Sequence, residues 1–228
     1  MGEPVGGGSK HGPPGPDAAL GPESIKAAAG VCHRVKNDFQ TIANILALGG
    51  AYARSPQDLA ESVEGRVVAL SLCYTLVAET GQPPSLDRLA EEVLRRNLWK
   101  GPALLRLERR LPEVSLSLRL CSPLSLMLHE IIDNALRHGL EQVSDPRLIL
   151  EGALDQEGLM VRVADNGPGL PPGFRPERDA RLGLKLAQAL AAIDLRGSLE
   201  LSDARPGLLA VLRVPAAELA RLTREIWW

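Results

Sequence analysis

Two apolar seams separated by a short turn are the feature that most limits how this chain can fold. From about Glu23 to Ala53, apolar residues recur three and four positions apart, as they do on one face of a helix. Ser55-Pro56 then supplies a capping residue and a proline suited to the first turn of a second helix. The seams are Cys32, Val35, Phe39, Ile42 and Leu46, followed by Val63, Val67, Leu70, Tyr74 and Val77. Residues 23–80 are therefore predicted to form an antiparallel helical hairpin.

A lone hairpin with two seams would leave an apolar face in water. Pairing with a second copy would bury that face in a four-helix bundle, so we predict a homodimer. Residues 1–22 precede the hairpin and contain seven Gly and five Pro with no triplet period. They are predicted to be a disordered Gly/Pro-rich tail outside the fold.

Gly81-Gln82-Pro83-Pro84 marks the start of a second predicted domain, residues 81–228, and its two prolines are a hinge candidate. Ser85 and Ser122-Pro123 are predicted to open helices, the second running to about His138. Further helices are expected over about 182–194 and 216–228, and strands near 105–110, 115–120, 147–154, 159–164, 197–202 and 207–213. Helices placed between groups of strands favour an α+β fold, with a helical layer over one mixed sheet.

The composition excludes several classes of protein. The formal net charge is −2, so no basic field favours nucleic acid or an anionic membrane surface. The uncharged run Val67 to Ala78 is too short to cross a bilayer, and no apolar signal core is present. Cys32, Cys73 and Cys121 are widely spaced, which suggests neither a disulfide framework nor a zinc site. We predict a soluble cytoplasmic protein.

The first chemical motif surrounds His33 on the first predicted helix. His33 lies one residue off the apolar seam, and Asn37 and Gln40 share its polar face. A neutral imidazole is a competent nucleophile near pH 7. Asn37 could orient a phosphoryl group on His33, or a water that attacks it. Taken alone, the stripe fits an ordinary solvated helix face better.

The second motif repeats Glu130, Asn134 and His138 every four residues along one helix face. A carboxylate and an amide oxygen one turn apart can hold a hard cation such as Mg²⁺. The alternative is a helix with a hydrated polar side. That alternative is weaker here, because a polar row beside an apolar stripe needs partners.

The third and fourth motifs are suited to a nucleotide. A predicted strand ends at Asp165, which could accept a hydrogen bond from an adenine amino group, and Gly167 and Gly169 let the backbone approach a ligand. Gly183 lies in the first turn of a predicted helix, whose amides and dipole suit a phosphate. The alternatives are a common turn sequence and plain helix packing.

In this order and spacing the four motifs resemble a sensor histidine kinase. The H-R-V-K-N stretch at His33 is similar to the phosphoacceptor box of the HisKA_2 family, close to the HWE group. The E-x-x-x-N-A-x-x-H stretch at Glu130 is similar to the N box of the GHKL ATPase superfamily. D-N-G-P-G at Asp165 and L-G-L-K-L at Leu182 resemble its G1 and G2 boxes. The resemblance covers residues 23–215.

The resemblance implies a dimeric helical bundle followed by an α/β sandwich, the Bergerat fold, that binds ATP. It implies an ATP-dependent protein-histidine kinase in which His33 is phosphorylated and then donates to an aspartate of a response-regulator receiver domain. Glu130 and Asn134 would lie at the Mg²⁺–triphosphate, with Glu130 as a base. The remaining nucleotide contacts would come from Arg137, His138, Asp165, Gly167, Gly169, Gly183 and Leu184.

Some residues depart from the family pattern. Gly30 and Cys32 replace an acidic residue and a second histidine that often precede the phosphoacceptor, and Arg181 replaces the first glycine of the G2 box. The Trp-x-Glu signature of the HWE group is absent before Asp165, although His129-Glu130 does resemble that group. Two alternatives follow: a histidine phosphotransfer protein with a degenerate ATP site, and a GHKL serine kinase of the anti-sigma type.

Overall fold

The computed structural model describes residues 22–53 and 55–223. The predicted tail lies outside the described residues except for its last position, and Trp227 and Trp228 lie outside them too. None of the described helices combines the length and the apolar character that a bilayer-crossing segment needs.

Helices and strands alternate along the chain after an all-helical start. The helices are α1 (Pro22–Tyr52), α2 (Pro56–Thr80), α3 (Leu86–Asn97), α4 (Leu118–Asn134), α5 (Pro176–Asp179), α6 (Leu182–Ile193) and α7 (Ala216–Thr223). A 3₁₀ turn, η1 (Leu98–Lys100), follows α3, and a π-helical turn, η2 (Ala135–Gly139), follows α4. The strands are β1 (Arg106–Arg110), β2 (Arg147–Leu154), β3 (Gly158–Asp165), β4 (Ser198–Asp203) and β5 (Leu208–Pro215).

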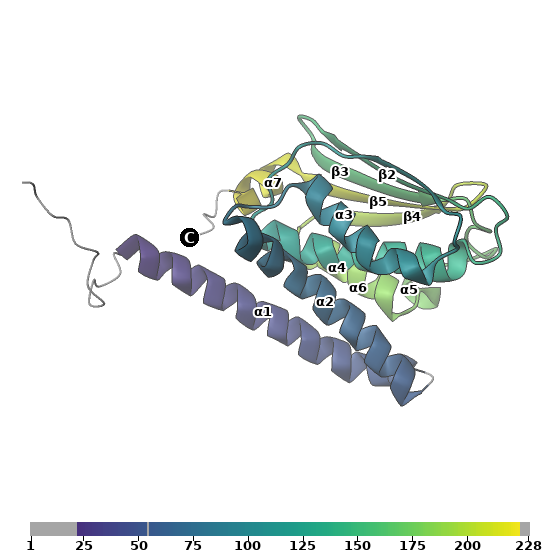
Figure 1. The fold of residues 1–228 in the computed structure, drawn as a ribbon, viewed down its shortest axis with the longest axis horizontal. Helices are drawn as coiled ribbons and strands as arrows, with labels where there is room; N and C mark the ends of the chain where they lie inside the picture. The colour runs from purple at the N-terminus through teal and green to yellow at the C-terminus, as the bar shows by residue number, and fades with distance from the viewer. Residues whose placement is uncertain (1–21, 54, 224–228) are drawn as a thin grey trace, which may run out of the picture.

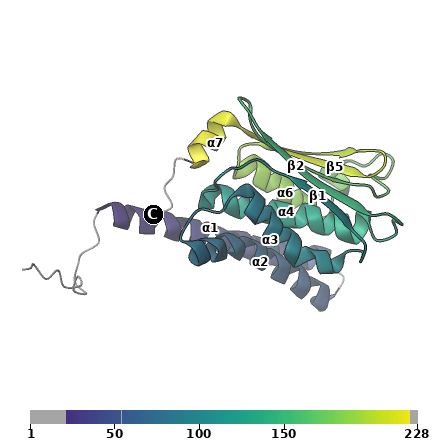
Figure 2. The same ribbon diagram turned by 45° about the horizontal axis from the view of Figure 1, so that its top comes forward.

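The strands form one five-stranded sheet in the order β1-β2-β3-β5-β4. β1 pairs with β2 in parallel and the remaining pairs are antiparallel, so the sheet is mixed. Helices α3, α4 and α6 cover one face of the sheet, and α1 and α2 lie beyond them (Figures 1 and 2). The predicted α+β architecture, a helical layer over one mixed sheet, is confirmed.

The hairpin and the sheet-bearing part share one continuous core. Leu72 of α2 is buried in the same cluster as Leu124 of α4 and Leu212 of β5. α4 is at the centre of this core, because it packs against α2 on one side and α6 on the other. The helix that carries Glu130 is therefore in contact with the hairpin.

Both hairpin helices form as predicted, but α1 does not turn its apolar seam toward α2. The residues it buries are Asp38 and Ile45, which are 6% and 2% exposed. Phe39 and Leu46, by contrast, are 66% and 49% exposed. The hydroxyl of Tyr74 on α2 donates to the Asp38 carboxylate at 2.6 Å, so a polar contact as well as Ile45 joins α1 to the rest of the protein. Most of the first seam therefore faces away from the core.

The start of α4 differs from the sequence-based prediction. We expected a strand near 115–120 and a helix from Ser122, but α4 begins at Leu118 and Pro123 lies inside it. Ser117 is the actual cap, since its hydroxyl accepts a hydrogen bond from the Leu120 amide. The alternation of Ser and Leu imitated a strand, because the first part of α4 buries its serines as well as its leucines and so lacks the exposed polar side of an amphipathic helix.

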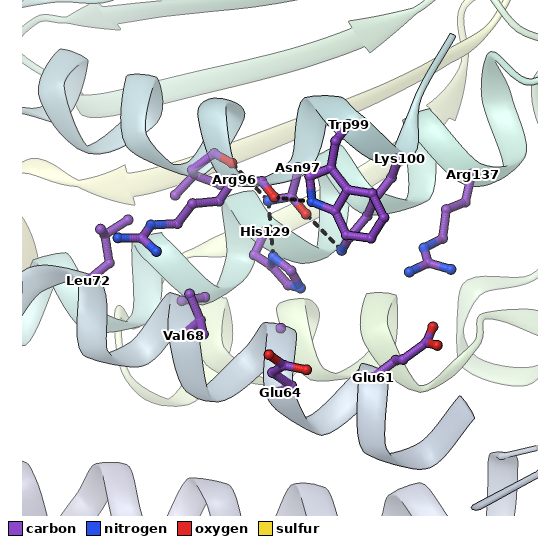
Figure 3. A pocket seen from close by; sticks show the side chains of 13 residues that line it. Glu61, Glu64, Val68, Leu72, Arg96, Asn97, Trp99, Lys100, His129 and Arg137 are labelled. Carbon is purple, nitrogen blue, oxygen red and sulfur yellow. Dashed lines mark hydrogen bonds between the residues drawn. The ribbon is translucent and has the colours of Figure 1, made fainter. Parts of the chain in front are cut away.

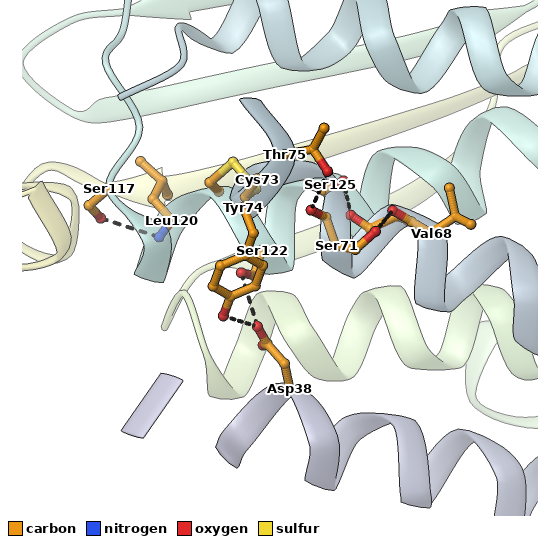
Figure 4. Close-up of a disulfide and its surroundings, with 12 residues drawn as sticks. Asp38, Val68, Ser71, Cys73, Tyr74, Thr75, Ser117, Leu120, Ser122 and Ser125 are labelled. Atoms are coloured by element: carbon orange, nitrogen blue, oxygen red, sulfur yellow. Dashed lines mark hydrogen bonds between the residues drawn. A yellow bond between two sulfur atoms is a disulfide. The ribbon is translucent and has the colours of Figure 1, made fainter. Parts of the chain in front are cut away.

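A disulfide joins Cys73 of α2 to Cys121 of α4 (Figure 4). The prediction that the cysteines form no disulfide is wrong. These two residues are 48 positions apart in the sequence, and they meet because α2 runs along α4. Cys32 is free and exposed, so it does not pack in the seam as its apolar neighbours suggested.

Candidate functional site

The second motif lies where α4 passes into the π-helical turn η2. Glu130 is buried at 6% exposure, Asn134 is half-buried, and Arg137 and His138 are exposed. The turn ends with a hydrogen bond from the Leu140 amide to the Ala135 carbonyl at 2.8 Å. Along this wider helix end the polar row therefore runs from the buried Glu130 to the exposed His138.

The Asp165 cavity, as we call it, is an open hollow of about 620 Å³ beneath the loop that follows β3. Its lining includes Asn134, His138, Gly139, Asp165, Gly169 and Leu184. Asp165 Oδ1 accepts hydrogen bonds from the amides of Gly167 at 2.8 Å and Leu208 at 3.3 Å. Oδ2 has no hydrogen-bond partner among the described residues and remains an acceptor. Burial raises the pKa of Asp165.

Two glycines of the third motif are required by the backbone around this cavity. A Cβ added to Gly167 would lie 2.2 Å from the carbonyl oxygen of Gly139, which is backbone and cannot turn away. Gly169 has φ +76°, a conformation that side-chain-bearing residues rarely adopt. The D-N-G-P-G loop therefore fits closely against the end of η2.

The Glu130 cavity is the neighbouring hollow of about 460 Å³ at the start of α6. Its lining includes Arg66, Lys100, Glu130, Asp133, Arg137, His138, Arg181 and Gly183. His138 and Arg181 border both cavities, and His138 Nε2 lies 3.0 Å from an Arg181 guanidinium nitrogen. Burial and the adjacent Arg181 charge lower the pKa of His138. An elongated ligand could therefore extend from one cavity into the other.

Glu130 does not face the Glu130 cavity with free oxygens. Arg66 of α2 donates from Nε to Oε1 at 2.6 Å and from Nη2 to Oε2 at 3.0 Å. Burial raises the pKa of Glu130, and the Arg66 charge acts in the opposite direction. Gly183 leaves space for this pair, because a Cβ there would lie 2.0 Å from Glu130 Oε2.

Comparison with known proteins identifies the two parts of the chain. Residues 31–108 match the HWE histidine kinase family, and residues 121–218 match the histidine kinase-, DNA gyrase B- and HSP90-like ATPase family. The chain belongs to the HWE histidine kinases.

Curated relatives support the assignment. The sensor histidine kinase PdtaS of Mycobacterium tuberculosis (strain ATCC 25618 / H37Rv) is 30% identical over 198 residues, covering 83% of this chain and 39% of PdtaS. A blue-light-activated histidine kinase of Rhizobium johnstonii is 27% identical over 189 residues, covering 82% of this chain and 52% of that protein. This HWE-family chain thus spans about two fifths to one half of these relatives.

A solved structure has the same fold. The Erythrobacter litoralis EL346 blue-light activated histidine kinase superposes with a TM-score of 0.68 at 19% identity, covering 91% of this chain and 64% of that one. At this identity the likeness concerns the fold alone.

The residues of this HWE-family chain fit ATP but do not, as arranged, fit the predicted Mg²⁺ site. The Asp165 cavity is open, its free carboxylate oxygen suits an adenine amino group, and the start of α6 suits phosphate. Asn134 lines the Asp165 cavity and could also face a cation. Glu130 could not, because Arg66 uses both of its oxygens.

The structure does not bring His33 to either cavity. His33 is exposed on α1, and Asn37, one turn later, is half-buried and accepts through its carbonyl from Thr41 at 3.1 Å. None of the described residues that line the two cavities belongs to α1. The first half of α1 lies at the end of the molecule away from α5 (Figure 1).

Sequence reasoning missed three charged residues of this site: Arg66, Lys100 and Asp133. Lys100 donates to Asp133 at 2.6 Å, and Arg137 donates to the same oxygen at 3.0 Å. A signal existed for Arg66 alone. It lies on α2 directly before the seam residue Val67 and three positions after the seam residue Val63, where a charge turned toward the core needs a buried partner.

His129, next to Glu130, forms part of a third hollow of about 420 Å³ between α2 and α3 (Figure 3). Its Nδ1 lies 3.2 Å from the side-chain amide of Asn97, which is itself 1% exposed. Burial is the main reason that the pKa of His129 falls to about 4, and the Lys100 charge adds to this. His129 is therefore neutral at physiological pH, and it carries no charge into the Glu130 cavity.

Proposed function

We propose that this chain is an ATP-dependent protein-histidine kinase of a two-component system. In this proposal it phosphorylates His33 and passes the phosphoryl group to an aspartate of a response-regulator receiver domain. The observation that carries it is the Asp165 cavity, where a buried carboxylate keeps one acceptor oxygen free beside glycines that admit a ligand. The family assignment supports the same activity.

Each cavity would hold one end of the nucleotide. Asp165 Oδ2 would accept from the adenine amino group, with Leu184 and the backbone at Gly167 and Gly169 around the base. Arg137 and the α6 amides at Gly183 would face the phosphates, and His138, which borders both cavities, would lie near the adenine or ribose. Asn134, joined by Glu130 only when Arg66 no longer occupies the Glu130 oxygens, would hold Mg²⁺, which would supply charge neutralisation during phosphoryl transfer.

His33 would provide the nucleophilic nitrogen. Its imidazole attacks the γ-phosphorus, an N–P bond forms as the O–P bond to ADP breaks, and the imidazole proton is released to a base. We assign that role to Glu130, with Asn37 orienting the transferred group. Because His33 lies away from both cavities, the hairpin must move relative to the nucleotide. The hinge would be Pro83-Pro84, between the proposed domains 23–80 and 81–228.

The proposed assembly is a homodimer through the hairpin. The outward-facing seam of α1, with Phe39 and Leu46 exposed, supports it, since apolar faces on helical hairpins are stabilised by burial. Sedimentation of the full chain tests the idea. Phe39→Ser should shift the protein to monomer, and a wild type that is already monomeric would contradict the proposed dimer.

Incubation with γ-labelled ATP tests the kinase. Wild type should form a label that is lost in acid, as a phosphohistidine is, and His33→Ala should form none. Added receiver domain should remove the label from wild type and carry it, whereas a receiver whose phosphoacceptor Asp is changed to Asn should not. Equal labelling of wild type and His33→Ala would overturn the assignment, and an acid-stable label would indicate a serine kinase.

A further inference from the structure

One side chain of the hairpin, Arg66, occupies the carboxylate on which the proposed Mg²⁺ site depends. Its Nε and Nη2 bind the two oxygens of Glu130 at 2.6 and 3.0 Å, and its Nη1 donates to the Ser62 hydroxyl. The two side chains are 8% and 7% exposed. A bidentate arginine leaves a carboxylate little capacity to bind a cation or accept a proton.

The same face of α2 is attached to α4 at two further points. The Ser125 hydroxyl donates to the Ala69 carbonyl at 2.5 Å, and Cys73 forms the disulfide with Cys121 (Figure 4). Along α2 these positions are three and seven residues after Arg66, so all three contacts share one side of the helix. The pairing with Glu130 therefore belongs to a docked arrangement of the whole of α2.

We propose that Arg66 is a positioning residue that holds this kinase in an autoinhibited arrangement. While α2 is docked on α4, Arg66 withholds Glu130 from the metal and from His33, yet the Asp165 cavity stays open to the base. Departure of α2 releases Glu130 and frees His33 to move in the same step. This inference rests on the proposed function.

Magnesium dependence of nucleotide binding provides a readout that does not require turnover. Calorimetry with a non-hydrolysable ATP analogue, with and without MgCl₂, measures it. In wild type, Mg²⁺ should change the dissociation constant less than about threefold, because Glu130 is occupied. In Arg66→Gln it should tighten binding by about tenfold or more. Arg66→Lys, which retains the charge but loses the two-pronged geometry, should fall between them.

Arg88→Gln is the matched control. Arg88 is an exposed α3 arginine paired with the exposed Glu91 and the buried Glu92, and it lines neither cavity, so its removal should leave the wild-type Mg²⁺ response. An unchanged response in Arg66→Gln would overturn the proposal. Weaker binding of Arg66→Gln both with and without Mg²⁺ would do the same, because Arg66 would then be a phosphate ligand.

A second variant leaves the Arg66–Glu130 ion pair intact, so it can test the proposal even if Arg66→Gln does not fold. Cys73→Ala removes the covalent tie between α2 and α4. It should phosphorylate His33 about tenfold faster than disulfide-bonded wild type, in kcat and not in KM for ATP. Cys32→Ala, a change at the exposed free cysteine, should leave nucleotide affinity as in wild type. Equal rates in disulfide-bonded wild type and Cys73→Ala would show that docking does not inhibit.

The failure of this inference can be told apart from failure of the proposed function. No nucleotide binding by any form would overturn the kinase assignment and the inhibitory role of Arg66 with it. Nucleotide binding with the same Mg²⁺ response in wild type, Arg66→Gln and Arg66→Lys would overturn the role of Arg66 alone.

Discussion

The Asp165 cavity and the Glu130 cavity are neighbours, but they are built differently. The Asp165 cavity is lined by residues from Asn134 onward, and its key carboxylate is held by backbone amides. The Glu130 cavity includes α2, and its key carboxylate is held by a side chain of the hairpin. The Asp165 cavity is formed without the hairpin, whereas the availability of the Glu130 carboxylate depends on the position of the hairpin.

The largest expected effect concerns the disulfide that fastens the hairpin. It closes a loop of 48 residues, so its loss should lower the free energy of unfolding by about 4 kcal/mol. Denaturant unfolding of wild type and a Cys73→Ala, Cys121→Ala double variant measures this. Adenosine affinity should be unchanged in the double variant if the Asp165 cavity is independent of the hairpin. A parallel loss of adenosine affinity would erase the distinction between the two cavities.

The next effect is a pH dependence from His129. Its folded pKa of about 4 lies below the ordinary 6.5, so the unfolded state binds more protons between these values. Stability should fall as pH drops from 6.5 to 4, by roughly 3 kcal/mol at about 1.36 kcal/mol per unit. Asp133, whose pKa is lowered by Lys100 against the effect of burial, acts at lower pH.

His129→Gln isolates this contribution, since Gln can still accept from Asn97 but does not titrate. Thermal or denaturant unfolding from pH 7 to pH 4 should show a flatter profile for the variant. If the stability of the two proteins fell equally between pH 7 and pH 4, His129 would not be the source of the pH dependence. The raised pKa of Glu130 is common to both proteins and cancels in the comparison.

Asp165→Asn should weaken ATP binding on the order of 100-fold, the loss expected for one hydrogen bond to a buried charge. Asn keeps an oxygen for the amides of Gly167 and Leu208 but replaces the free acceptor with a donor. Calorimetry in wild-type and Cys73→Ala backgrounds should give the same factor. Different factors would show that the docked hairpin influences the Asp165 cavity.

The smallest expected effect is that of Tyr74→Phe. It removes the hydroxyl that donates to the buried Asp38 carboxylate at 2.6 Å, which should cost about 2 kcal/mol of stability. Chemical denaturation measures the loss, and Thr75→Val, at an exposed position of the same helix, is the control. Nucleotide affinity should not change, and a change there would couple the far side of the hairpin to the cavities.

Features that lie within one short segment of the sequence could be predicted, and contacts between distant segments could not. β2 was expected over 147–154 and occupies those positions, since its pattern lies within one segment. Asp165, Gly167 and Gly169 likewise lie within one contiguous motif. Arg66 and Glu130 are 64 positions apart, and Cys73 and Cys121 are 48 apart. No periodicity within a segment can show such pairs, because they depend on how α2 lies on α4.

The rotation of α1 shows the same limit. Its apolar spacing predicted that Phe39 and Leu46 would face the hairpin partner, yet both are exposed and Asp38 is buried instead. The buried carboxylate is stabilised by Tyr74 of α2 and by Ser122 of α4, whose hydroxyl lies 3.4 Å away. In place of Phe39 and Leu46, α1 buries a carboxylate that contacts two other helices.

That contact also has a consequence for the angular position of His33. Asp38 lies five positions after His33 on the same helix and is bonded to two other helices at once. α1 cannot turn about its own axis without breaking both of these hydrogen bonds. The Asp38 carboxylate would then need new hydrogen-bond donors or water, because an unpaired buried charge is costly. The His33 imidazole is therefore expected to project from α1 in only a few distinct directions, and to switch between them without stable intermediate positions.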